Sequence, residues 1–318
     1  MRIQLVIYRK EKYVNKPCYR WEVLPVLFKK GGCELDFIGK KEVKYFYFRY
    51  ISFNPDIVVS AGFAGGLIAA FFNKLGLIKK PLVHDWNDDY VYVMGKKYGR
   101  VPIGFFEKFI IKNSDYIVTP SKHNEKKAKK MGKKVKYIPH GVKKDYRIFN
   151  KKLPGKNKVV YAGEISRMKN VDKLINAVQG LDCQLFLFGK MAEKDLIHGK
   201  NVRYMGLVKK ELLPTYYQQV DILVLTMDND CCIKMYEYIL MGKPILALDG
   251  KVSNILKHKK TAYITKNLKE GLNELLKNKR LLNSITKNLK RVKVYSWSDI
   301  ANKYIKHLSD IVRMTKNE

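Results

Sequence analysis

The sequence predicts an α/β protein made of two domains, each with a parallel sheet covered by helices. Short apolar runs alternate with helical patterns along the whole chain, which is the order expected when helices join parallel strands. The 318 residues suffice for two cores, and the 46% hydrophobic content excludes a disordered chain. A polar stretch at 150–157 contains a Pro-Gly pair and no periodicity, as linkers do. We therefore expect a first domain at 1–150 and a second domain from 151.

The strands of the first domain are expected where short apolar runs follow polar turns. One run, Ile57 to Phe72, has no charge over 16 residues, which is short of the ~20 that cross a bilayer. Because its first half contains several glycines, we interpret it as a strand, a glycine-rich turn and a buried helix at 66–74. The expected strands are 3–8, 34–38, 57–60, 82–84, 116–119 and 136–138.

The second domain continues this alternation without an internal sequence repeat. An amphipathic run from Ile300 to Val312 follows Ser296 and Ser298, either of which is suited to cap a helix. One face of another helix is expected from the spacing of Val171, Leu174, Ile175, Val178 and Leu181. The expected strands are 158–161, 184–188, 202–204, 222–225 and 245–248.

The segment 234–245 places one acidic residue, Glu237, on a short helix between two expected strands. Gly242 is suited to end this helix in a left-handed conformation, and Pro244 prevents its continuation. A helix that follows a parallel strand points its N-terminus at the carboxyl edge of the sheet, where phosphates bind. Glu237 can then reach a sugar or ribose hydroxyl. The alternative is an ordinary helix with Glu237 on its solvated face.

The formal net charge is +34, from 63 basic and 29 acidic residues. A field of this sign attracts nucleic acid, anionic lipid or phosphorylated substrates. A non-enzymatic polyanion or nucleic-acid-binding protein is one alternative, although no helix concentrates the charge and no RNA-binding aromatic signature occurs. Six lysines around one expected helix favour docking of the first domain on an anionic membrane: Lys126, Lys127, Lys129, Lys130, Lys133 and Lys134.

The five cysteines are odd in number and Cys231 and Cys232 are adjacent, so neither a disulfide framework nor a zinc site is indicated. A reducing, cytoplasmic setting fits best, and the first apolar run is too short for a signal peptide. The stretch 228–230 reads Asp-Asn-Asp, a spacing that suits a divalent cation. We favour an acidic helix cap at Asp230 instead and expect no metal site.

Seven kinds of segment resemble motifs of the family 4 glycosyltransferases and follow the family's order, and the segment 234–245 resembles its nucleotide-sugar motif. They are Pro55–Val59, Pro81–Asp85, Asn113–Ser121, Ile138–Val142, Tyr161–Val171, the glycine turns Phe188-Gly189 and Met205-Gly206, and Tyr295–Trp297.

The resemblance implies the GT-B fold, in which two Rossmann-like domains turn their parallel sheets toward a cleft. The second domain would then span 151–296, and a C-terminal helix at 297–318 would return to the first domain. The resemblance also implies a UDP- or GDP-sugar donor, transfer with retention of anomeric configuration, and no metal or other cofactor.

Site residues follow from the resemblance as well. Fixed positive charge at Lys169 and Arg167 would stabilise the diphosphate that leaves the sugar. A satisfied core histidine remains the alternative for His84, and a surface lysine the alternative for Lys169. The expected residues are His84, Asp85 and Glu237 for catalysis, Gly163, Arg167, Lys169, Lys234 and Glu237 for the donor, and Gly62, Gly65, Trp86 and His140 on the acceptor side.

Three departures from the family pattern bear on the site. Glu164 stands where the family often has arginine, and Arg167 is the nearest replacement. Asn229 stands eight residues before Glu237, where the family often has a second glutamate, and Asp230 stands seven residues before it. The charged stretch 8–12 takes the place of a glycine-rich loop after the first strand.

The expected function is transfer of a sugar from a nucleotide-sugar to an acceptor, most simply a lipid-linked sugar or glycan precursor. Such an enzyme would sit peripherally on the cytoplasmic face of the membrane and contact its anionic surface. A GT-B sugar-nucleotide epimerase is the alternative enzyme. Nucleic acid would be attracted without sequence preference, so no specific nucleic-acid partner is expected.

Overall fold

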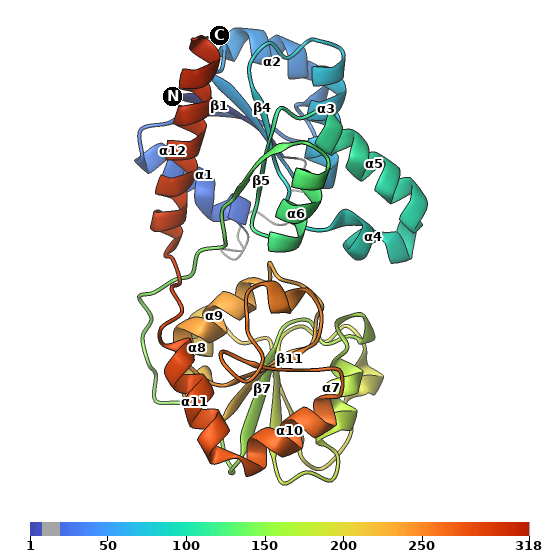
Figure 1. The fold of residues 1–318 in the computed structure, drawn as a ribbon, viewed down its shortest axis with the longest axis vertical. Helices are drawn as coiled ribbons and strands as arrows, with labels where there is room; N and C mark the ends of the chain where they lie inside the picture. Colours follow the sequence, from blue (N-terminus) through green and yellow to red (C-terminus); the bar gives the residue numbers. More distant parts are fainter. Residues whose placement is uncertain (8–19, 318) are drawn as a thin grey trace. The chain divides into compact units, whose positions relative to one another are not determined.

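The computed structural model describes residues 1–7 and 20–317, which form two compact units (Figure 1). Unit 1 comprises Met1–Gly141 and Tyr295–Glu318, and unit 2 comprises Val142–Val294. Within the described residues, each unit contains one parallel sheet of six strands, so the expected α/β fold with two Rossmann-like sheets is confirmed. The stretch 142–150 lies in unit 2. The stretch 8–12 and Cys18 lie outside the described residues.

The sheet of unit 1 has the strand order β2-β1-β3-β4-β5-β6. From β3 to β6, every step connects neighbouring strands in one direction, with at least one helix in the crossover. The strands are β1 (Arg2–Ile7), β2 (Glu34–Ile38), β3 (Ile57–Ala61), β4 (Leu82–Asp85), β5 (Tyr116–Thr119) and β6 (Lys134–Tyr137). The helices are α1 (Arg20–Lys30), η2 (Val43–Tyr45), α2 (Phe46–Phe53), α3 (Gly62–Lys74), α4 (Tyr90–Tyr98), α5 (Arg100–Lys112), α6 (Lys122–Lys130) and α12 (Trp297–Lys316).

Two helix layers cover the sheet of unit 1. On one face, α1 and α12 pack on side chains such as Leu5 and Val59, and the ring of Tyr304 lies 5.7 Å from that of Trp21. On the other face, α2 and α3 pack on Val58 and its neighbours, and α5 and α6 pack on the part of the sheet near β5. Ser296 caps α12 through a capping box with Asp299, which selects one of the two predicted caps.

The helix α3 begins at Gly62, immediately after β3, so the expected glycine-rich turn before residue 66 is wrong. The glycines lie within the first turns of the helix because the helix packs closely on the sheet. A Cβ atom at Gly65 would stand 2.4 Å from the carbonyl oxygen of Val6, and one at Gly66 would stand 2.5 Å from the ring of His84. Only glycine permits this approach.

The sheet of unit 2 has the strand order β12-β11-β10-β7-β8-β9. The three-residue strand β12 was not predicted, because its apolar run is too short to be distinguished from a turn. The strands are β7 (Lys158–Ala162), β8 (Gln184–Phe188), β9 (Val202–Gly206), β10 (Ile222–Leu225), β11 (Ile245–Leu248) and β12 (Tyr263–Thr265). The helices are η3 (Arg167–Lys169), α7 (Val171–Val178), η4 (Lys194–Leu196), η5 (Lys210–Leu212), α8 (Leu213–Tyr217), α9 (Ile233–Met241), η6 (Lys251–Asn254), α10 (Leu268–Lys277) and α11 (Lys279–Leu289).

None of the helices in residues 1–7 and 20–317 combines the length and the apolar character that a bilayer crossing needs.

Candidate functional site

The predicted donor residues gather at the carboxyl edge of the unit 2 sheet. Strands β7 and β10 are parallel neighbours that end at Ala162 and Leu225, so the segments that follow them emerge next to each other. The helix α9 begins eight residues after β10 ends, with Cys232 as its N-cap. Gly242 ends α9 at φ +64°, as predicted. The edge therefore offers two segments to a phosphate ligand, the turn after β7 with Gly163 and Lys169 and the first turn of α9 with Lys234.

Hydrogen bonds fasten the segment after β7 to the end of β10. The side-chain amide of Asn170 donates to the carbonyl oxygen of Thr226 at 2.9 Å, and the Thr226 hydroxyl donates to the carbonyl oxygen of Lys169. Asn170 is left-handed at φ +53° and precedes the first residue of α7. Sequence reasoning missed Thr226, because an asparagine directly before a helix predicts a cap, whereas the Asn170 side chain makes no cap bond and binds Thr226 instead.

Lys169 is half-buried, and its side chain forms no ion pair within the described residues. Its backbone is fixed on both sides, because Lys169 N–H donates to Ser166 at 3.1 Å and its carbonyl accepts from Thr226. A lysine that gives up part of its hydration without a carboxylate partner is suited to an anionic ligand.

Glu237 lies between two lysines. The Lys234 ammonium is 2.7 Å from one carboxylate oxygen and the Lys210 ammonium is 3.6 Å from the other. Burial acts to lower the pKa of Lys234, but the charge of Glu237 and the hydrogen bond to it raise that pKa above its usual value. The Glu237 side chain is 16% exposed, so it can still accept hydrogen bonds from a bound hydroxyl.

Gly163 and Gly189 bring two turns into contact at this edge. The N–H of Gly163 donates to the carbonyl oxygen of Phe188 at 2.9 Å. A Cβ atom at Gly189, where φ is +139°, would stand 1.8 Å from the carbonyl oxygen of Gly163. Glycine is therefore required at position 189 for the backbone of the Gly163 turn to keep its place.

The guanidinium of Arg167 is bound by two carboxylates from the connection between β8 and β9. It pairs with Glu193 and Asp195, and hydrogen bonds to Asp195 and then Glu193 raise its pKa further. Glu164, which follows the glycine, is exposed and accepts from the Ser166 hydroxyl at 3.3 Å. The phosphate role of Arg167 stays a prediction, and a phosphate there would have to displace two carboxylates.

Asp228 and Asp230 hold the loop that follows β11. Asp228 accepts a hydrogen bond from the N–H of Lys251, and Asn254 donates to Asp230 at 3.2 Å. The expectation that Asp230 caps α9 is wrong, because the N-cap is Cys232 and makes no side-chain cap bond. Within residues 1–7 and 20–317, no group of three or more His, Cys, Asp or Glu side chains is arranged to hold a metal ion.

In unit 1, His84 has no exposed surface at the end of β4. Its Nδ1 lies 2.9 Å from the Ser60 hydroxyl and its Nε2 lies 3.1 Å from the Tyr90 hydroxyl. Burial lowers the pKa of His84 to about 3, so the imidazole is neutral at ordinary pH. These contacts are those of a satisfied core histidine, and a role in acceptor chemistry stays a prediction.

Asp85 is likewise fully buried. The Arg20 side chain donates to Asp85 at 2.8 Å and to the carbonyl oxygen of Pro139 at 2.9 Å, and the Tyr304 hydroxyl donates to Asp85 at 3.1 Å. Burial raises the pKa of Asp85, while the Arg20 charge acts to lower it. Asp85 thus joins α1, β4 and α12, and a catalytic role for it also stays a prediction.

The predicted acceptor-side residues are mostly internal. Trp86 is fully buried, and His140 is 6% exposed with its ring 6.1 Å from that of Trp297. Gly65 packs on β1. At Gly62, where φ is +70°, an added Cβ atom would meet no atom of the described residues within 4 Å.

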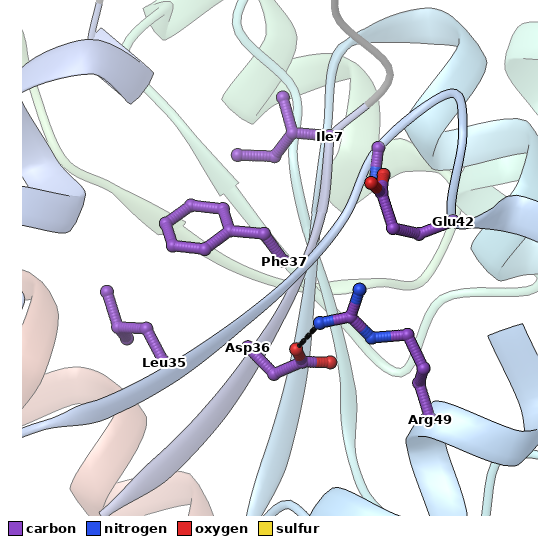
Figure 2. A pocket seen from close by; sticks show the side chains of 7 residues that line it. Ile7, Leu35, Asp36, Phe37, Glu42 and Arg49 are labelled. Atoms are coloured by element: carbon purple, nitrogen blue, oxygen red, sulfur yellow. Dashed lines mark hydrogen bonds and ion pairs between the residues drawn. The ribbon is translucent and has the colours of Figure 1, made fainter. Parts of the chain in front are cut away.

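A cavity of about 420 Å³ opens beside the edge strand β2 (Figure 2). Arg49 of α2 pairs with Asp36 over this cavity, and Glu42 accepts from the N–H of Gly39 at 2.9 Å. Charged groups beside an apolar wall suit a small polar ligand. No sequence pattern singled these residues out. The lining consists of Ile7, Leu35, Asp36, Phe37, Gly39, Glu42 and Arg49.

Residues 156–278 match the family described as "Glycosyl transferases group 1". A comparison with characterised protein sequences finds no match. The sucrose-phosphate synthase of Thermosynechococcus elongatus is similar in structure, with a TM-score of 0.79, 14% identity, and coverage of 98% of this chain and 99% of that chain.

Two further solved structures are similar over nearly the whole chain. HepE of Anabaena in complex with UDP has a TM-score of 0.74 and 13% identity, covering 98% of this chain and all of that chain. The lipopolysaccharide outer core galactosyltransferase WaaB has a TM-score of 0.69 and 14% identity, covering 96% and 99%. At these identities the likeness establishes the fold.

Proposed function

We propose that the chain is a glycosyltransferase that takes its sugar from a nucleotide-sugar, because its second unit matches the group 1 glycosyl transferases and its fold is that of solved glycosyltransferases. Solved structures of HepE hold UDP and UDP-glucose, which favours a uridine donor over a guanosine donor. The expected retention of anomeric configuration rests on the resemblance to family 4. No divalent metal is needed in this proposal.

The observation that carries the proposal is the environment of Lys169. It is a half-buried lysine without an ion-pair partner among the described residues, fastened through Asn170 and Thr226 to the end of β10. Breaking a sugar–diphosphate bond places negative charge on the leaving group, and a positive charge held in place stabilises the transition state. Glu237, whose carboxylate two lysines orient, would accept hydroxyl groups of the ribose or the sugar.

For the acceptor we propose a lipid-linked sugar or glycan precursor bound by unit 1, on the cytoplasmic face of a membrane. The net charge of +34 supports an acceptor at an anionic surface. The cavity beside β2 supplies carboxylate and guanidinium groups for sugar hydroxyls and an apolar wall at Phe37. His84 and Asp85 would act on the acceptor only by orienting the segments around it.

The test combines donor binding with one substitution. UDP-, GDP- and ADP-glucose are titrated against the purified protein by calorimetry, and donor consumption is followed with membrane lipid extract as acceptor. Lys169→Met should lower kcat/KM by about 2–4 kcal/mol, roughly 30- to 1000-fold. Lys173→Met, an exposed lysine of α7, is the matched control and should leave it unchanged. Equal rates for the two variants, or no binding of any nucleotide-sugar, would contradict the proposal.

A further inference from the structure

The outer surface of three neighbouring helices in unit 1 carries large apolar side chains. Phe48 of α2 is 73% exposed, Phe105 of α5 is 66% exposed, and Val101 of α5 is 84% exposed. Several exposed phenylalanines on one surface are unusual, because they leave a large apolar area in contact with water unless a partner covers it. We call this surface the aromatic face; its members are Tyr47, Phe48, Ile51, Phe71, Leu75, Val101, Phe105 and Phe106.

Contacts between aromatic rings show that the three helices form one continuous layer. Phe46 of α2 stacks on Phe72 of α3 with ring centroids 4.3 Å apart. Phe63 of α3 meets Phe106 of α5 at 6.3 Å. These helices follow one another along the same face of the sheet, away from α1 and α12 (Figure 1). Their exposed side chains therefore point outward from a single surface.

The charge of this layer has one sign. The only acidic residue in α2, α3 and α5 is Glu107, which is 1% exposed and is bound by the N–H of Tyr90 and by Lys127. Exposed lysines lie among the apolar side chains, and the ammonium of Lys74 reaches the ring of Phe109 at 5.5 Å. The lysines are Lys44, Lys74, Lys108 and Lys112.

We propose that the aromatic face docks on the surface of an anionic lipid bilayer, with its apolar side chains at the level of the headgroups and its lysines on the lipid phosphates. Apolar side chains mixed with lysine and free of exposed carboxylate are the composition of interfacial membrane binders. A second copy of this chain would bring the same positive charges together. The proposal deepens the one for a lipid-linked acceptor, on which it rests for its biological use.

The lysines around α6, expected from the sequence to form the docking surface, are partly occupied. Lys127 pairs with the buried Glu107, and Lys129 pairs with Glu125 at 2.9 Å. Lys133 donates to the carbonyl oxygens of Lys112 and Ser114. No apolar side chain of α6 is exposed, so α6 lacks the part that enters a bilayer. The aromatic face therefore replaces α6 as the contact.

Liposome flotation tests the proposal without any sugar transfer. The full chain is mixed with two kinds of vesicle. One consists of phosphatidylcholine alone, and the other contains in addition about 30% of the anionic lipid phosphatidylglycerol. The wild type should bind the anionic vesicles at least about tenfold better than the neutral ones, and high salt should weaken the binding.

Two sets of variants separate the surfaces. The double variant Phe48→Ser/Phe105→Ser should lose at least about tenfold in flotation, whereas Leu207→Ser, which removes an 81% exposed side chain of unit 2, should not. Lys126→Gln/Lys130→Gln on α6 should have a smaller effect than Lys74→Gln/Lys108→Gln. All four of these lysines are exposed. An unchanged Tm and unchanged UDP binding verify that each variant is folded.

Three results would overturn the docking surface: wild-type flotation of Phe48→Ser/Phe105→Ser, loss of binding in the α6 variant alone, or a dimer in light scattering that this double variant abolishes while no vesicle binds. If the wild type does not bind UDP, the proposed donor is contradicted, whereas the flotation result still stands. The two proposals therefore fail separately.

Discussion

The side-chain amide of Asn170 and the carbonyl oxygen of Thr226 are joined by a 2.9 Å hydrogen bond across 56 residues of sequence. The bond connects the turn after β7 to the end of β10, and the Thr226 hydroxyl returns a bond to the carbonyl of Lys169. The position of Lys169 therefore depends on two neighbouring strands rather than on its own loop.

Replacing Asn170 should affect both stability and transfer. Asn170→Gly keeps the left-handed backbone and loses the bond, which costs about 1 kcal/mol of unfolding free energy. Asn170→Ala should cost roughly 1 kcal/mol more, because alanine is strained at φ +53°. Urea denaturation gives the stability, and kcat/KM should fall in both variants because Lys169 loses its support. Full activity in Asn170→Gly would show that Thr226 alone positions the lysine.

Glu237→Gln should lower kcat/KM by about 2 kcal/mol, roughly thirtyfold, because the neutral amide binds donor hydroxyls less strongly than a carboxylate. The fold should persist, since Lys234 and Lys210 keep access to solvent. Glu211→Gln, an exposed residue beside Lys210, is the control in the same assay. If both variants transfer sugar at the wild-type rate, Glu237 has no part in donor binding.

Activity should survive EDTA. The carboxylates of Asp228 and Asp230 already bind Lys251 and Asn254, and Lys169 supplies positive charge for the diphosphate. Transfer rates are measured in chelator and after addition of Mn²⁺ or Mg²⁺. Complete loss in EDTA with recovery on Mn²⁺, together with inactivity of Asp228→Asn, would establish the Asp-x-Asp stretch as a cation site instead.

The stability of unit 1 should decrease as the pH is lowered, because His84 is buried in its neutral form. Its pKa is about 3 in the folded protein and 6.5 in the unfolded chain, so between these values only the unfolded chain binds the proton. Unfolding free energy should therefore drop by about 1.4 kcal/mol per pH unit as pH falls below 6.5. His84→Asn should flatten this slope in denaturation curves from pH 4.5 to 7, and exposed His198→Asn should not. An unchanged slope in His84→Asn would mean that other groups set the pH dependence.

Arg20→Met should destabilise unit 1 by about 3–5 kcal/mol, because it leaves the buried carboxylate of Asp85 without its charge partner. Burial already raises the pKa of Asp85, and without Arg20 the folded state binds its proton at still higher pH. The deficit should therefore shrink as pH falls toward 5, since protonation then favours the folded state. Arg20→Met/Asp85→Leu should recover part of the loss in urea denaturation. A deficit that does not vary with pH would argue that packing, not charge, is lost.

Local sequence signals predicted the regular elements well. Gly242 ends α9 and Ser296 caps α12 because these signals act within a few residues. Glycine misled the prediction at α3, where it serves close packing on β1 and β4 rather than a turn. Strands whose bounds agree in full are β2, β5, β8, β10 and β11.

The candidate site was predictable in place but not in its contacts. The order of strands located Lys169 and Glu237 at one sheet edge. The partners of Arg167 come from residues 26 and 28 positions later, and no local pattern encodes such ion pairs. In the same way, burial of His84 and Asp85 follows from α3 and from Tyr304 of α12, which are distant in sequence.

The place of α12 in unit 1 also sets the order of events during synthesis. Its side chains complete the core over Trp21 and β1, so this core cannot close until residues near 311 have left the ribosome. Unit 2 is continuous from Val142 to Val294 and emerges whole before them. At a synthesis rate of roughly 5–20 residues per second, the apolar face that α12 later covers stays exposed for about ten to thirty seconds. The second unit can therefore complete its core first on the nascent chain, while the face of the first unit that α12 covers is still exposed.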